Sequence, residues 1–424
     1  MEAELEKFRN EAGFYLSRLV GKILVPPENV YLEITAKCNL RCRMCNLWRQ
    51  DIKGELSKEQ CFRIIGDMSE LRIPHLIISG GEPFLRDFVI DISNYAKKKW
   101  IRHVSVISNG TLINEKTAEE IANSGIDHIT ISIDGLMKNN DYVRGKGSFK
   151  KGVNAINLIT KYSRKIRNGG LTAGINCVVQ NRNLEELPDM ARLAKRLGCN
   201  IIVFQPMLSD NLSMHKRLTR DELWVPRERI PILEQSINEL LRMKKDKAYS
   251  DLIFVEPIVL KLIKDYYAGT MKHQNIKCYD GYIRIVINSR GSLWMCDSNY
   301  GESTEHSLKE LFTSACANKL RKGIKKCAKP CLQACVLKPE LESLEKISKR
   351  FASSIPRGKS KNAFYALKIL GNYEKTIKSK CDLSPIEKCL AFFGKGSTNP
   401  AYALSEIRNA KRIIRKFRGD VLNV

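Results

Sequence analysis

Short apolar runs alternate with amphipathic stretches through the first half of the chain. The stretches between the runs, such as 57–71 and 183–198, repeat apolar residues at helical spacing. Alternation of strands and helices is typical of a parallel α/β domain, and we expect one over residues 29–210. Six runs have the β-branched composition of strands: Val30–Thr35, His75–Ser79, His103–Ser108, His128–Ile133, Thr172–Val179 and Asn200–Gln205.

The segments on either side of this domain have a different pattern. Residues 1–28 have apolar positions at helical spacing and predict an amphipathic helix packed on the adjoining domain. Residues 211–277 predict a helical connector without a chemical motif. Residues 341–424 are basic and helical, and we favour a helical appendage docked on the barrel; binding to an acidic membrane or to RNA stays open. One helical face of this last region carries Leu404, Ile407, Ile414 and Phe417.

Three cysteines follow the first predicted strand within one short loop: Cys38, Cys42 and Cys45. Iron–sulfur clusters are normally held by four cysteines, so a loop with three leaves one iron able to bind a small chelating molecule. Structural zinc requires a closed shell of four ligands, which this loop does not offer. The spacing therefore predicts an iron–sulfur cluster with an open position.

This cysteine spacing resembles that of the radical S-adenosylmethionine (radical SAM) superfamily. The resemblance implies a partial TIM-like barrel of six βα units, and a [4Fe-4S] cluster whose open iron binds SAM. It further implies reductive cleavage of SAM to a 5′-deoxyadenosyl radical, which abstracts hydrogen from a substrate. Met44 precedes the third cysteine, at a position that contacts the adenine of SAM in the family.

Further candidate residues lie where predicted strands end, the edge at which parallel barrels carry their chemistry. After the second strand, two glycines allow a tight turn that exposes peptide groups to a ligand. This segment matches the family's GGEP sequence, which receives the SAM amino group: Gly80, Gly81, Glu82 and Pro83. Ser108 and Asn109 follow the third strand, and Asn109 is equally well interpreted as a turn residue.

The fourth strand ends in Ser132 and Asp134, which alternate onto one side. In the family, corresponding positions often bind the ribose hydroxyls of SAM. Arg144 follows in the position of an arginine that often contacts the SAM carboxylate in relatives, although an ordinary surface arginine is the alternative.

A second cysteine group occupies residues 278–340. Cys278 and Cys296 flank a predicted β-hairpin, and further cysteines come later: Cys327, Cys331 and Cys335. This resembles the SPASM/twitch extension of radical SAM enzymes, which implies an auxiliary [4Fe-4S] cluster. Five cysteines suffice for one such cluster with one to spare. A zinc site is the alternative.

Composition adds limits on location and partners. The net charge is +26, which favours anionic partners, although a lysine-rich solvated surface gives the same charge. The sequence contains neither a long apolar run nor a signal peptide, so we expect a cytoplasmic protein. Its fourteen cysteines then serve as metal ligands or small buried hydrophobes rather than disulfides. The expected buried hydrophobes are Cys61, Cys177 and Cys199.

The chain has no flavin or NAD fingerprint, so the electron for SAM cleavage would come from an external low-potential donor, a flavodoxin or ferredoxin. We therefore expect a radical SAM oxidoreductase or transferase acting on a peptide, a lipid or a cofactor precursor. The alternative is a basic, metal-stabilised nucleic-acid-binding or scaffolding protein without catalysis.

Overall fold

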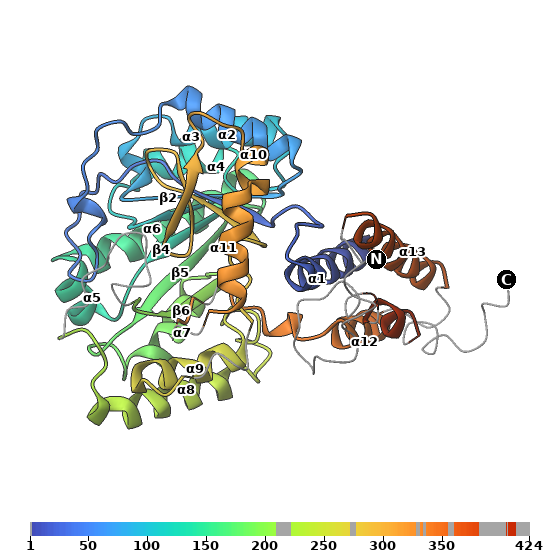
Figure 1. Ribbon diagram of the computed structural model, residues 1–424. Coiled ribbons are helices and arrows are strands. Elements are labelled where there is room, and N and C mark those ends of the chain that lie inside the picture. The colour runs from blue at the N-terminus through green and yellow to red at the C-terminus, as the bar shows by residue number, and fades with distance from the viewer. Residues whose placement is uncertain are drawn as a thin grey trace.

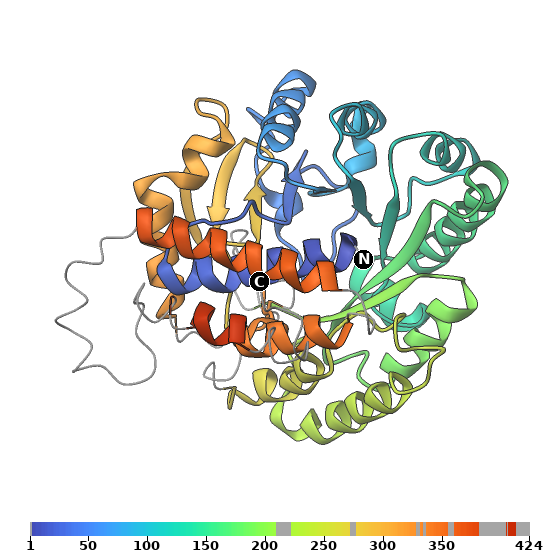
Figure 2. The same cartoon turned by 90° about the vertical axis from the view of Figure 1, so that its right-hand side faces the viewer.

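The computed structural model describes residues 2–208, 222–271, 277–327, 331–333, 336–354, 360–380, 404 and 406–412. Its centre is an open nine-stranded sheet in the order β6-β5-β4-β3-β2-β1-β7-β8-β9, with helices around its outer side (Figures 1 and 2). The first six strands are parallel and agree closely with those predicted from sequence. They are β1 (Asn29–Glu33), β2 (His75–Ser79), β3 (His103–Ser108), β4 (His128–Ser132), β5 (Thr172–Val179) and β6 (Ile201–Pro206).

The connecting helices bury one apolar face against this sheet. In the first, Cys61, Ile64, Ile65 and Met68 are buried, and Ser57 caps its amino end in a capping box with Gln60. This packing joins helices and sheet into one core and confirms the expected α/β fold. The connecting helices are α2 (Lys58–Glu70), α3 (Val89–Lys98), α4 (Glu115–Ala122), α5 (Met137–Arg144), α6 (Ser148–Arg167) and α7 (Leu187–Arg196).

The predicted hairpin is present, but it belongs to the barrel sheet. β7 (Arg284–Ile287) pairs in parallel with β1, and β8 (Ser292–Met295) and β9 (Ser298–Glu302) continue the sheet in antiparallel fashion. Ile285 and Ile287 are fully buried in the barrel core, which explains why the hairpin adds to this edge. Helices α10 (Leu308–Thr313) and α11 (Ala315–Lys325) come after it.

The expected helical connector contains α8 (Ile230–Met243) and α9 (Pro257–Ala268), which lie beside α7 and β6 (Figure 1). Tyr267 joins α9 to the barrel because its hydroxyl donates to the Val179 carbonyl and accepts from the Met207 N–H at 2.8 Å. The connector therefore covers the last strand of the parallel sheet.

A second, smaller apolar core joins the two ends of the sequence (Figures 1 and 2). Here α1 (Glu2–Val20) packs on α12 (Leu344–Ser354) and α13 (Ser360–Lys380), with the rings of Phe8 and Phe351 4.5 Å apart. The amino-terminal helix thus packs on distant helices, and it also contacts the barrel through the Glu6–Arg102 ion pair at 2.7 Å.

The apolar face expected for the last region is partly visible. Leu404 and Ile407 are buried in the smaller core, whereas Ile414 and Phe417 lie outside the described residues. The described part of this face is used for packing in the smaller core, together with residues of α1, α12 and α13. None of the helices in the described ranges has the length and apolar character needed to cross a bilayer.

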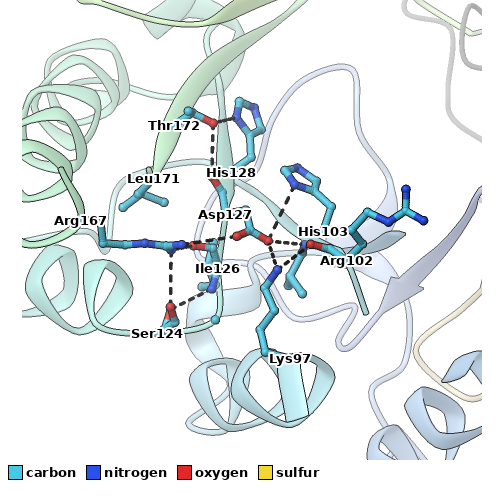
Figure 3. A network of polar contacts seen from close by, with 12 residues as sticks. Lys97, Arg102, His103, Ser124, Ile126, Asp127, His128, Arg167, Leu171 and Thr172 are labelled. Carbon is cyan, nitrogen blue, oxygen red and sulfur yellow. Dashed lines mark hydrogen bonds and ion pairs between the residues drawn. The ribbon is translucent and has the colours of Figure 1, made fainter. Parts of the chain in front are cut away.

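At the amino-terminal ends of the strands lies a polar network that we call the barrel floor. It comprises His103, His128, Asp127, Lys97 and Arg167 (Figure 3), together with His75, which contacts His103. The His75 and His103 rings meet edge-on at 4.7 Å, and His128 Nδ1 lies 2.7 Å from the Thr172 hydroxyl. Lys97 and Arg167 contact the Asp127 carboxylate at 2.5 and 3.4 Å. The negative charge of Asp127 at the floor is therefore balanced by cations of the same network.

Candidate active site

The opposite, carboxyl-terminal end of the barrel brings the predicted motifs together. The backbone of Gly81 donates to the Thr35 carbonyl at 2.7 Å, and that of Glu82 donates to the Lys37 carbonyl at 2.9 Å. A Cβ atom on either Gly80 or Gly81 would lie 2.2 Å from one of these carbonyl oxygens. Two glycines are therefore needed so that the chain entering the cysteine loop can lie directly on the end of β2.

The N–H groups of Gly81 and Glu82 do not face a ligand, because carbonyl groups at the start of the cysteine loop already accept from them. Pro83 begins the short helix η2 (Pro83–Leu85). The segment thus holds the loop in place through its backbone.

The Glu82 carboxylate is fully buried and joins the ends of two strands. It accepts from the Ser108 hydroxyl and the Asn109 N–H, each at 2.8 Å, and from the Phe84 N–H at 3.2 Å. Burial raises the pKa of Glu82 to about 7, although these hydrogen bonds oppose the shift. Glu82 therefore fixes Ser108 and Asn109 where β3 ends.

The three loop cysteines are free thiols, with Cys42 buried and Cys38 and Cys45 half-buried. Burial raises the pKa of Cys42 to about 12, and nearby negative charge on Cys38 and Cys45 adds to the shift while Arg144 opposes it. The thiols thus lie within electrostatic reach of one another. Met44 belongs to a small apolar cluster with Val143, Val178, Met207 and Leu223.

The thiols fit an iron–sulfur cluster better than a single ion. Among the residues that the structure describes, no three metal-binding side chains converge on one point. In a cluster each cysteine binds a different iron, so its ligands surround a common space rather than one atom. Three neighbouring thiols on one tight loop satisfy that requirement.

Asp134 and Arg144, each expected to contact SAM, contact each other. Arg144 Nε lies 2.7 Å from Asp134 Oδ2, with both side chains almost completely buried. Asp134 Oδ1 also accepts from the Val178 N–H at 2.9 Å. Ser132 is the last residue of β4 and is half-buried. The pair places a balanced charge beside the buried Cys42 thiol.

Sequence reasoning missed Glu55, whose side chain supports the entry to the cysteine loop. Its carboxylate accepts from the Ala36 N–H at 2.6 Å and the Thr35 hydroxyl at 2.9 Å, and it pairs with Arg86 at 3.2 Å. Asn183 was missed as well; it is fully buried and donates to the Asp134 carbonyl at 2.6 Å. Both lie in polar stretches, and their partners are distant in sequence, so no local pattern marks them.

Arginines and aromatic rings form the outer rim of the cysteine loop. The guanidinium of Arg43 lies 4.3 Å from the centre of the Tyr142 ring, and that of Arg182 lies 3.8 Å from it. Arg41 stacks similarly on Trp48 at 4.9 Å. A hollow of about 450 Å³ opens here, lined by Arg41, Arg43, Asp141, Tyr142, Val143 and Gly145. The two arginines in its lining favour anionic ligands.

The fold brings three cysteines of the second group, Cys278, Cys296 and Cys331, near one another. Burial raises the pKa of Cys331 to about 12, and nearby Cys296 and Asp280 contribute to the shift; Cys331 has the same effect on Cys278. Cys296 adopts a left-handed backbone conformation (φ 57°), and its N–H donates to Asp280 at 2.6 Å. Cys327 is exposed, and Cys335 lies outside the described residues.

Comparison with known proteins agrees with this geometry. Residues 32–194, which span most of the parallel barrel, match the family model described as the radical SAM superfamily. This part of the chain is therefore a radical SAM domain. The resemblance seen in the cysteine loop is confirmed.

Individual relatives match over parts of their length. A pre-heme d1 synthase from Dinoroseobacter shibae is 30% identical over 41% of this chain and 42% of its own. A PqqA peptide cyclase from Granulibacter bethesdensis is 28% identical over 62% of this chain and 65% of its own. The chain thus spans between about two fifths and two thirds of these relatives.

The crystal structure of Streptococcus suis SuiB bound to the precursor peptide SuiA superposes with a TM-score of 0.56 at 13% sequence identity, covering 76% of this chain and 71% of that protein. At this level of identity the comparison concerns the fold alone, and it agrees with the α/β architecture described above.

Proposed function

We propose that the chain binds a [4Fe-4S] cluster through Cys38, Cys42 and Cys45, and binds SAM at the iron left open. The observation that carries this is the set of three free, neighbouring thiols on a loop held to the end of β2. When bound, the cluster supplies the electron that cleaves SAM, and the resulting radical abstracts hydrogen from the substrate. The family resemblance implies contacts with SAM for Met44, Ser132, Asp134 and Arg144, and we propose those roles in this chain.

The residues of the site have separable tasks in this proposal. Glu82 and the paired glycines hold the loop, and the Asp134–Arg144 pair balances charge next to Cys42. The arginine rim faces the entrance and selects anionic groups of the substrate.

We propose a peptide as the substrate, with a cofactor precursor as the second candidate. The peptide cyclase aligns over 62% of this chain, whereas the pre-heme d1 synthase aligns over 41%, and SuiB was crystallised with a precursor peptide. The longer match favours peptide modification.

An auxiliary iron–sulfur cluster is the proposed occupant of the second cysteine group. Cys278, Cys296 and Cys331 are neighbours, and a fourth ligand would come from Cys327 or Cys335. We also propose a cytoplasmic location, because an oxygen-sensitive site needs a reducing compartment, and an external donor of the flavodoxin or ferredoxin type. Metal analysis that finds zinc in this group would replace the auxiliary cluster by a structural metal site.

The decisive experiment replaces Cys38, Cys42 and Cys45 together by alanine in anaerobically reconstituted protein. We expect loss of about four irons per chain and no release of 5′-deoxyadenosine from SAM under strong reductant. Cys316→Ala is the matched control, because this thiol is exposed on α11, and it should retain both properties. Unchanged iron content and SAM cleavage in the triple variant would contradict the proposal.

A further inference from the structure

Asn109 contacts the first cysteine of the loop from the end of β3. Its side-chain nitrogen Nδ2 lies 3.9 Å from Cys38 Sγ and donates to it. The same nitrogen donates to Asn39 Oδ1 at 2.8 Å. Asn109 is 8% exposed, so water has little access to this contact.

The direction of the Asn109 amide is fixed by Thr111. Asn109 Oδ1 accepts from the Thr111 N–H at 2.9 Å and from the Thr111 hydroxyl at 2.6 Å. If the amide were reversed, its NH₂ group would face the Thr111 N–H, and two donors would oppose each other. The NH₂ group must therefore point towards Cys38.

A closed ring of hydrogen bonds supports this orientation. The Thr111 hydroxyl accepts from Asn39 Nδ2 at 2.8 Å and donates to Asn109, which in turn donates to Asn39. Each member donates once around the ring, so the directions are mutually consistent. The backbone N–H of Asn109 is in addition held by the Glu82 carboxylate at 2.8 Å. Asn109 is thus locked from both its backbone and its side chain.

We propose that Asn109 is a positioning residue that raises the reduction potential of the SAM-binding cluster through its N–H contact with the Cys38 sulfur. The inference rests on the proposed function, since it needs the cluster at Cys38. Reduction adds one electron, taken from an external low-potential donor, and makes the cluster more negative. An N–H group directed at a ligating sulfur stabilises that added charge. The Leu40 N–H, at 3.5 Å from the same sulfur, acts in the same direction.

The test is a redox titration of the reconstituted protein, followed by electron paramagnetic resonance of the signal that changes when SAM is added. Asn109→Leu removes both side-chain donors and should shift the midpoint potential to a more negative value. Thr111→Val removes the hydroxyl that orients the amide and should shift it less, in the same direction. Asn114→Leu is the matched control: Asn114 lies near Asn109 in sequence and caps α4 through the Thr117 N–H.

A potential that is lower in Asn109→Leu and Thr111→Val but unchanged in Asn114→Leu supports the inference. If variants with full iron content have the same midpoint potential as the wild type, the inference is overturned and the proposed function still stands. The same holds if Asn114→Leu shifts the potential as much as Asn109→Leu does. If Asn109→Leu does not hold iron, the midpoint potential of Thr111→Val decides between these outcomes. Wild-type protein without a SAM-sensitive cluster would overturn the proposed function and this inference with it.

Discussion

The two ends of the barrel stabilise buried charged groups in different ways. At the floor, the Asp127 carboxylate is shared by Lys97 and Arg167 and is partly open to water (Figure 3). At the mouth, the fully buried Asp134 pairs with Arg144, and the partners that the described residues provide for Glu82 are N–H and O–H groups rather than cations. Redundant partners favour stability, whereas a sparsely compensated site is where function is concentrated.

The largest effect should come from breaking the buried Asp134–Arg144 ion pair at the mouth. Arg144→Ala leaves the Asp134 carboxylate buried without its cation, and we expect a loss of about 3–5 kcal/mol in the free energy of unfolding, measured with urea. Arg167→Ala at the floor leaves Lys97 in place and should cost about 1 kcal/mol or less. Equal losses would mean that the two ends do not differ in how they compensate charge.

The second prediction concerns the backbone contact that positions the cysteine loop. In Gly81→Ala the new methyl group would meet backbone atoms of Lys37 and Ala36 at 2.2–2.6 Å, which no side-chain movement can relieve. We expect a cost of about 3 kcal/mol and weaker retention of iron at the first cluster. Gly66→Ala is the control: it lies inside α2 with open space around it and should gain about 1 kcal/mol.

The floor should make the protein sensitive to acid. Burial, aided by His103, lowers the pKa of His128 to about 4 from an ordinary 6.5. The unfolded chain therefore binds the proton first, so the stabilisation is complete above pH 6.5 and is lost as the pH falls towards about 4. A shift of this size corresponds to about 3 kcal/mol. Burial lowers the pKa of His75 to about 3, which acts in the same sense.

Urea unfolding at several pH values across this window measures the effect. His128→Gln should flatten the pH dependence, while His306→Gln, at an exposed position, should leave it unchanged. The other charged groups facing the histidines are Asp127, Lys97 and Arg167. An undiminished slope in His128→Gln would show that the acid sensitivity arises elsewhere.

The smallest effect is expected at the outer rim of the mouth. Arg43 and Glu222 form an ion pair at 3.4 Å with more than 40% of each side chain exposed. A double-mutant cycle with Arg43→Ala and Glu222→Ala should give a coupling energy of about 0.5 kcal/mol that decreases with added salt. A coupling as large as that of the buried pair would mean that exposure is not what separates the two sites.

Local sequence patterns were enough to predict most of the barrel and the centre of the site. Dense β-branched runs located the six parallel strands, and the cysteine loop was recognisable because its ligands are neighbours in sequence. The partners of Asp134 and of the Glu55 carboxylate were not predicted, because they depend on how separate βα units pack. The parallel pairing of β7 with β1 likewise joins segments some 250 residues apart, and no periodicity within either segment specifies it.

The packing of α1 against α12 has a consequence during protein synthesis. Phe8 leaves the ribosome well before Phe351, its ring partner, and at about 5–20 residues per second the interval is roughly 20–70 seconds. The barrel lies between them in the sequence and has time to fold first. Throughout that interval the apolar face of α1 lacks the helices on which it packs in the folded protein. We therefore expect chaperones to bind the nascent chain until α12 and α13 emerge.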